Sequence, residues 1–350
     1  GKGGPSISPI RIDLQASRLM LLGQRYADTR LQMTSTAAGH RVQVQGSGID
    51  GALDIPQAEG GTVSGRFTNA TFAVGKPVAG PVRAPVAGPD DINPARVPPL
   101  DIAIQELRVN GRALGSVNLK THPTAAGMQV DALQLRAPNQ AIDVQGMWTG
   151  TGTAARTRMD MQIDSRDYGA LLGRLGFADQ LKKGKGRMGM SLSWPGAPSD
   201  FSPGALSGTM DINVQDGQLV EIEPGAGRVL GLLSVARLPQ RLTLDFRDFF
   251  DKGFAFDRIE GKVRFAGGLA RSEGLVIEGP AAQIDIMGNA NMVSQQFDQT
   301  IEVRPRTGNL LTAVGAVAGG PVGAAVGAVA NAVLKKPLSE VGAKAYRVTG

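Results

Sequence analysis

Few side chains of this 350-residue chain could carry out chemistry, and their spacing builds no reactive site. The two histidines, His40 and His122, could act as a base or a metal ligand, but neither has a second histidine at ligand spacing. The chain has no cysteine, which excludes disulfides and thiolate metal sites. Asp90 and Asp91 form a carboxylate pair in a stretch of turn-forming residues, where aspartate is common for conformational reasons. No phosphate-binding loop or nucleophile motif is present in the sequence. We therefore expect a protein that is not an enzyme and holds no metal or cofactor.

The basic residues do not form a nucleic-acid-binding patch either. The formal net charge is +6, which would suit anionic lipid head groups or nucleic acid. The charges are scattered, and the one dense basic run, residues 182–187, has no interleaved aromatic residue. We expect a solvated loop there and no nucleic-acid partner.

The residues that do form a pattern are apolar and alternate with polar ones. This period of two is typical of strands with one apolar face, and Gly or Pro separates the runs between residues 241 and 292. The sequence predicts an antiparallel meander with one oily and one wet side. The candidate inner-face residues are Leu133, Leu135, Ile142, Val144, Leu242, Leu244, Phe246, Phe254, Phe256, Val263, Phe265, Leu275, Ile277, Ile284 and Ile286.

The strand pattern repeats along the chain. Residues 128–146 align without a gap on residues 270–288, so that Leu133 falls on Leu275 and Gly146 on Gly288. A fainter copy covers residues 30–46. Self-similarity at a fixed register indicates an architecture that extends by adding strands.

Five segments follow from these patterns. We expect strands over 1–74, a Pro/Gly-rich loop over 75–99, and strands over 100–306, interrupted by short helices near 167–176 and 228–235. An apolar Gly/Ala helical pair is predicted over 307–337 and a terminal strand over 338–350. We expect the whole chain to be a fragment of a longer protein, because a strand pattern begins and ends it.

The helical pair could cap the sheet or contact a membrane. Residues 310–334 carry no charge, but Gly319, Gly320 and Pro321 break the run into two helices that are each too short to span a bilayer. Lys335 and Lys336 follow, where a positive charge suits a helix C-terminus or lipid phosphate. The candidate cap or membrane-contact residues are Leu310, Leu311, Val314, Val317, Val322, Val326, Val329, Val333, Leu334, Lys335 and Lys336.

Residues 222–288 closely resemble the C-terminal region of the YhdP family of AsmA-like proteins. The charge-free segment 310–334, the ending 346–350 and residues 167–194 are similar to the same family. The resemblance implies a mostly β fold, a long, bent antiparallel sheet that forms an open apolar groove. It also implies a bridge-like lipid transport protein of the Gram-negative envelope. Such a protein would lie in the periplasm, anchored to the inner membrane by an N-terminal segment absent from this chain. Its C-terminal end would contact the outer membrane.

The cost of exposing lipid acyl chains to water favours the same function. The acyl chains of a phospholipid hold about 30 methylene groups, so exposing them to water costs on the order of 25 kcal/mol. A continuous apolar face would lower that barrier without tight binding. The alternative is a non-catalytic periplasmic scaffold or envelope-assembly module with a closed β core, because one-sided apolar strands also line ordinary sandwiches.

Overall fold

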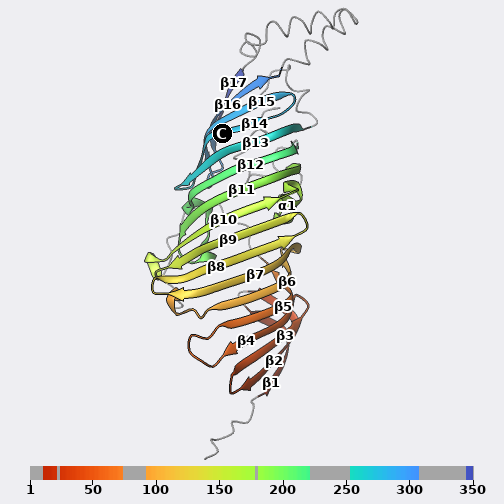
Figure 1. Ribbon diagram of the computed structural model, residues 1–350, viewed down its shortest axis with the longest axis vertical. Coiled ribbons are helices and arrows are strands. Elements are labelled where there is room, and N and C mark those ends of the chain that lie inside the picture. The colour runs from red at the N-terminus through yellow and green to blue at the C-terminus, as the bar shows by residue number, and fades with distance from the viewer. Residues whose placement is uncertain are drawn as a thin grey trace, which may run out of the picture. The chain divides into compact units, whose positions relative to one another are not determined.

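The protein is mostly β-structure. The computed structural model describes residues 11–21, 24–73, 92–177, 180–220, 253–306 and 344–349, and these form an open 17-stranded sheet with one α-helix and four 3₁₀ turns (Figure 1). This confirms the expected fold class. The chain divides into two compact units. Unit 1 holds strands up to β10, the end of β11 and the turns η1 to η4, and unit 2 holds α1, the start of β11 and the later strands.

Unit 1 contains two antiparallel runs of strands that are joined by one parallel pair. From β1 to β9 each strand is hydrogen-bonded to the next strand along the chain. Its strands are β1 (Arg11–Leu21), β2 (Gln24–Thr36), β3 (Gly39–Gly46), β4 (Ile49–Pro56), β5 (Val63–Phe72), β6 (Leu100–Val109), β7 (Arg112–Thr124), β8 (Gly127–Ala137), β9 (Gln140–Thr149) and β10 (Arg156–Ser165). The 3₁₀ turns are η1 (Pro94–Arg96), η2 (Gly152–Ala154), η3 (Pro198–Asp200) and η4 (Pro203–Ala205).

One pairing in unit 1 departs from the predicted antiparallel sheet. Strands β5 and β6 run parallel, with Val63 beside Leu100 and Phe72 beside Val109. A parallel pair needs a long return connection, and the Pro/Gly-rich segment before Leu100 supplies one. The sequence predicted a loop for this segment but gave no sign that the strand after it runs parallel to the strand before it.

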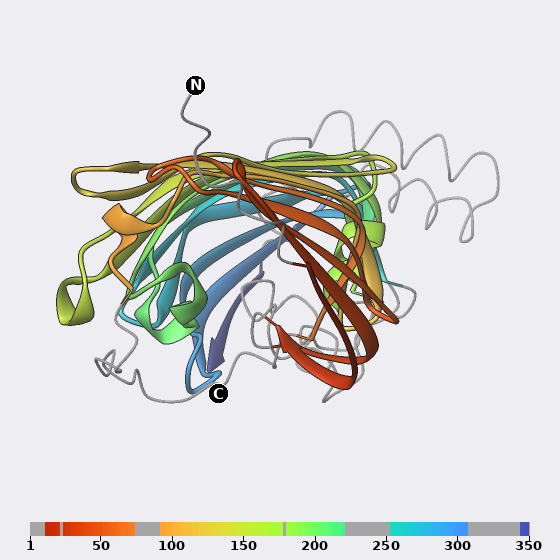
Figure 2. The same cartoon turned by 90° about the horizontal axis from the view of Figure 1, so that it is seen from below.

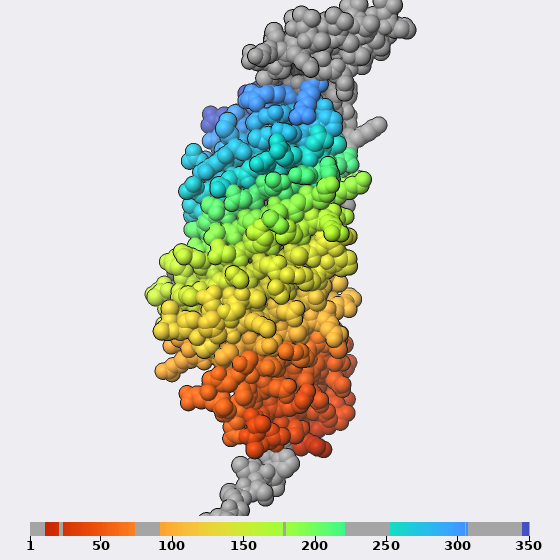
Figure 3. Space-filling view, viewed as in Figure 1, coloured from red at the N-terminus to blue at the C-terminus, as the bar shows by residue number. Residues whose placement is uncertain are grey.

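Unit 2 is an uninterrupted antiparallel meander in its described part. Strand β11 (Leu181–Pro195) starts in this unit, and β12 (Ser207–Leu219), β13 (Phe254–Ala266), β14 (Leu269–Glu278), β15 (Ala282–Asn291), β16 (Phe297–Pro305) and β17 (Lys344–Thr349) follow. From β12 to β17 each strand is hydrogen-bonded to the next. In Figure 3 the colours of this unit therefore run in chain order from green to blue.

Glycines and bulges let the strands bend. Register shifts occur within β8, between Val130 and Leu133, and within β14, between Glu273 and Leu275. A bulge bends the strand that carries it and increases its twist. Figure 2 shows the strands of unit 1, red to yellow, bending along their length.

The short helix expected near residues 167–176 is present as α1 (Tyr168–Leu175). Asp167 caps it by accepting a hydrogen bond from the Ala170 amide, and Gly176 ends it with a left-handed φ of 99°. Tyr168 and Leu171 are buried. Among the described residues, no helix is long and apolar enough to cross a membrane.

The basic run 182–187 is not the loop that the sequence predicted. It lies in β11, with Lys182, Lys183, Lys185 and Arg187 exposed. Lys183 has a φ of 57° and Gly184 a φ of 85°, so the strand is irregular at this point but stays in the sheet. The helices predicted at 228–235 and 307–337 lie outside the described residues.

Candidate functional site

Two apolar rows cross strands β1 to β9 of unit 1. Residues paired across neighbouring strands lie on the same face of a sheet, so the registers define each row. The first row is Leu14, Leu31, Val44, Gly51, Phe67, Ile104, Val117, Leu135 and Ile142. The second row is Ile12, Met33, Val42, Leu53, Gly65, Ile102, Leu119, Leu133 and Val144. We call the face that carries these rows the inner face of unit 1.

The row between them is polar and lies on the opposite, outer face. It consists of Asp13, Gln32, Gln43, Ala52, Arg66, Ala103, Asn118, Gln134 and Asp143. Asp13 accepts hydrogen bonds from Arg30 and Gln32, and the Arg30 guanidinium is the main reason that the pKa of Asp13 falls to about 2. On all nine strands the polar row therefore lies between the two apolar rows, and its only apolar members are Ala52 and Ala103.

The inner face of unit 1 is only partly shielded from solvent. Val44, Val117 and Val144 are buried, whereas Leu133 and Leu135 keep part of their surface exposed. This unit therefore presents apolar side chains that a bound molecule could cover further.

The inner face of unit 2 has the same construction and is more buried. One row is Val214, Ile259, Ile277, Ile284 and Val303, and a second is Leu275, Ile286, Ile301 and Tyr346. Ile277, Ile284 and Val303 have an exposed fraction of 0%. The same apolar pattern thus gives a partly exposed face in one unit and a dry face in the other.

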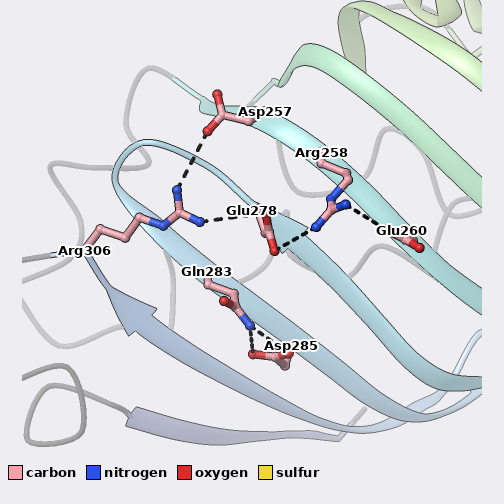
Figure 4. Close-up of polar contacts among 7 residues, drawn as sticks. All are labelled: Asp257, Arg258, Glu260, Glu278, Gln283, Asp285 and Arg306. Carbon is pink, nitrogen blue, oxygen red and sulfur yellow. Dashed lines mark hydrogen bonds and ion pairs between the residues drawn. The ribbon is translucent and has the colours of Figure 1, made fainter. Parts of the chain in front are cut away.

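The outer face of unit 2 is held by ion pairs (Figure 4). Arg258 contacts Glu260 and Glu278, and Arg306 lies 3.8 Å from Glu278 and 3.9 Å from Asp257. These side chains are between 29% and 60% exposed, so each pair contributes about 1 kcal/mol or less to stability. Their charges offset one another, which leaves the outer face polar but not strongly basic or acidic.

The structure sorts the candidate inner-face residues into members of the apolar rows, buried residues of β13, and residues outside the described ranges. Leu133, Leu135, Ile142 and Val144 are members of the two rows of unit 1, and the candidates on β14 and β15 are members of the rows of unit 2. On β13, Val263 and Phe265 are buried on the inner face, and Phe254 and Phe256 are each 3% exposed. The candidates Leu242, Leu244 and Phe246 lie outside the described residues, as do all the cap or membrane-contact candidates between 310 and 336.

The repeat seen in the sequence is a repeat of strand register. Leu135 pairs with Ile142 in unit 1, and their counterparts Ile277 and Ile284 pair in unit 2. The bulges in β8 and β14 also fall at equivalent places. The sequence analysis expected strands in this part of the chain but named no inner-face candidate from β1 to β7, although alternation such as that of Val42 and Val44 indicated one.

The two histidines are surface groups. The His122 ring lies 2.9 Å from the Asp131 carboxylate with both side chains about half exposed, and His40 lies 2.7 Å from the Ser35 hydroxyl. No group of three or more metal-ligating side chains occurs in the described ranges. The Ser35–His40 contact joins two directly paired residues of the β2–β3 hairpin at the exposed surface.

Each unit thus carries an apolar face and a polar face on an open sheet, which is the construction of a β-groove protein. The YhdP family model, described as YhdP protein, matches residues 2–350, and the chain belongs to that family. It is 25% identical over 358 residues to the intermembrane phospholipid transporter YhdP of Escherichia coli strain K12. That match covers 99% of this chain and 28% of the relative, so the chain spans little more than a quarter of the relative's length. No solved structure matches the chain.

Proposed function

We propose that this chain is part of a bridge-like phospholipid transporter and that its inner face carries lipid acyl chains. The observation that carries the proposal is the pair of apolar rows that cross nine strands of unit 1. The relative's name, an intermembrane phospholipid transporter, supports the same function.

The rows run in the direction that transport requires. Strands lie about 4.8 Å apart, so a row of nine residues extends about 38 Å across the strands of unit 1. An acyl chain that moves along a row exchanges one Leu, Ile or Val contact for another. Because each buried methylene is worth about 0.8 kcal/mol at every position, the free energy stays nearly level along the path.

The setting of the transporter forms the second part of the proposal. An intermembrane carrier works between two membranes, which supports the periplasm of a Gram-negative cell as the location. We propose an inner-membrane anchor outside this chain. We also propose that the segment 307–337, with Lys335 and Lys336 after its apolar residues, contacts the outer membrane or caps the groove there.

One observation favours a different function for part of the chain. The inner face of unit 2 is dry, with Ile277 and Ile284 at 0% exposure, as in the core of a scaffold module. Under this second reading, unit 2 is an envelope-assembly module and only unit 1 carries lipid.

Native mass spectrometry of the full chain, purified without phospholipid-stripping detergent, tests the proposal. We expect mass increments that match phospholipids, and lipid extraction should recover species with two acyl chains. A mass that corresponds to the bare chain, unchanged after incubation with phospholipid vesicles, would refute lipid carriage and leave the scaffold.

A further inference from the structure

A third row of side chains crosses the inner face of unit 1 beside the second apolar row. Side chains two positions apart along a strand point to the same face, and each member of the third row lies two positions from a member of the second. The two rows are therefore about 7 Å apart along the strands. From β2 to β7 the third row is Ser35, His40, Ile55, Val63, Leu100 and Thr121.

The part of this third row on β2, β3 and β4 is open to solvent and carries a polar pair. The Ser35 hydroxyl lies 2.7 Å from Nδ1 of the His40 ring, and His40 is exposed. Ile55 pairs with His40 on the next strand and is 39% exposed. At the β7 end, by contrast, Thr121 is 4% exposed and its hydroxyl accepts a hydrogen bond from the Leu100 amide. Ser35 and His40 are therefore the polar side chains of the third row that a bound molecule can reach.

The Ser35–His40 pair keeps one donor for a further group in either tautomer of the neutral imidazole ring. When the Ser35 hydroxyl donates to Nδ1, the ring proton is on Nε2, which can donate it to another acceptor. When Nδ1 carries the proton and donates to the Ser35 oxygen, the hydroxyl hydrogen can turn to another acceptor. An anionic oxygen is the strongest acceptor for such a donor, whereas an acyl chain offers no acceptor at all.

We propose that the Ser35–His40 pair donates a hydrogen bond to the phosphate of a phospholipid whose acyl chains lie on the apolar rows. The inference rests on the proposed function and deepens it by naming the residues that contact the head group. In a phospholipid only the glycerol separates the acyl chains from the phosphate, and the polar pair lies only about 7 Å beyond the second apolar row. The neighbouring Arg41 and Asp54 face the outer side and pair with each other at 3.6 Å, so neither charge is directed at the inner face.

Competition between two lipids tests the inference. The full chain is incubated with vesicles that hold equal amounts of a phospholipid and of the diacylglycerol with the same acyl chains, which lacks the phosphate. Native mass spectrometry then gives the ratio of bound phospholipid to bound diacylglycerol. In His40→Leu this ratio should fall about ten-fold relative to the wild-type chain, because a hydrogen bond to a charged group is worth about 1.5 kcal/mol.

His122→Leu is the matched control for the competition. His122 is the other histidine of the chain, is about half exposed, and lies on the outer face beside Asp131. Its replacement should leave the ratio of the two bound lipids unchanged. Both histidines are exposed on strands, so both variants should keep the far-ultraviolet circular dichroism spectrum of the wild-type chain.

Nuclear magnetic resonance of the imidazole rings gives an independent readout, because the chain has only two histidines. A short-chain phospholipid should shift the signals of His40 and leave those of His122 in place. Inorganic phosphate alone, at the same concentration, should shift neither, because it has no acyl chains to hold it on the apolar rows.

The outcomes separate the inference from the function on which it rests. An unchanged lipid ratio in His40→Leu, or an equal fall in His122→Leu, would overturn the phosphate contact and leave lipid carriage intact. A His40 shift with inorganic phosphate as large as the shift with phospholipid would also overturn it, in favour of a site for free phosphate. Absence of both lipids from the wild-type chain would overturn the inference and the proposed function together.

Discussion

A carboxylate placed at the same repeat position in each unit should have opposite consequences. Leu135 of unit 1 and Ile277 of unit 2 are counterparts, and each pairs with an isoleucine on the next strand. Leu135 is partly exposed, whereas Ile277 has no exposed surface. Substitution by aspartate therefore tests whether the same pattern forms an open surface in one unit and a packed core in the other.

The expected energies differ enough to be measured. Ile277→Asp loses about 2–3 kcal/mol of apolar burial and also buries an unpaired carboxylate, which adds several kcal/mol. The sum is comparable with the total stability of a typical domain, about 5–15 kcal/mol, so unit 2 should unfold or be strongly destabilised. In Leu135→Asp the carboxylate keeps its hydration, and the loss should be about 1–2 kcal/mol.

Urea denaturation followed by far-ultraviolet circular dichroism measures both variants, and vesicle transfer measures their lipid binding. Leu135→Asp should stay folded and lose lipid binding, because acyl chains would have to desolvate the charge. Ala132→Asp is the matched control: Ala132 is on the same strand but the outer face, opposite Lys120, so folding and binding should persist. Unfolding of Leu135→Asp to the same extent as Ile277→Asp would show that unit 1 also has a closed core, and the groove argument would fail.

Three further predictions concern the framework. Hydrogen bonding to Arg30 lowers the pKa of Asp13 from 3.8 to about 2, so its contribution to stability is fully present above pH 3.8 and is lost as the pH falls through 2. Hydrogen exchange in the hairpin of Asp13 should therefore accelerate over that window, and Asp13→Asn should remove the dependence; an unchanged profile would contradict the pairing. In Gly288→Ala the new Cβ would lie 2.3 Å from a backbone oxygen at a φ of 130°, so the free energy of unfolding and the thermal midpoint should both fall. In Gly267→Ala the new Cβ meets open space, so the free energy of unfolding should fall by only about 1–2 kcal/mol and the thermal midpoint should fall less. Equal falls in the thermal midpoint of the two variants would contradict the register in which Gly288 pairs with Gln299. Asp167→Ala removes the cap of α1 and should cost about 1 kcal/mol by urea denaturation, with no change in lipid binding.

Local alternation was enough to predict the faces of individual strands, because side chains in a strand have a fixed period of two. It predicted that Leu133 and Leu135 share one face of their strand and that Ile284 and Ile286 share one face of theirs. The repeat between residues 128–146 and 270–288 predicted that the strands of the two units have the same register. The Asp167 cap likewise followed from residues close together in the chain.

Features that depend on distant residues could not be predicted in the same way. The parallel pairing of β5 with β6 depends on the path of a long connection, which no short pattern encodes. The different exposure of Leu135 and Ile277 depends on what packs against each unit, and the two residues have nearly the same sequence surroundings.

Site-specific photocrosslinking along β8 tests lipid carriage by the inner face most directly. A photoreactive amino acid at 133, 134 or 135 samples the inner face, the outer face and the inner face again, with Gln134 hydrogen-bonded to Asp143 on the polar side. We predict phospholipid adducts at 133 and 135 and few at 134, detected by mass spectrometry of the full chain after incubation with phospholipid vesicles. Equal labelling at the three positions, or no adduct at 133 and 135 in a folded chain, would contradict the account.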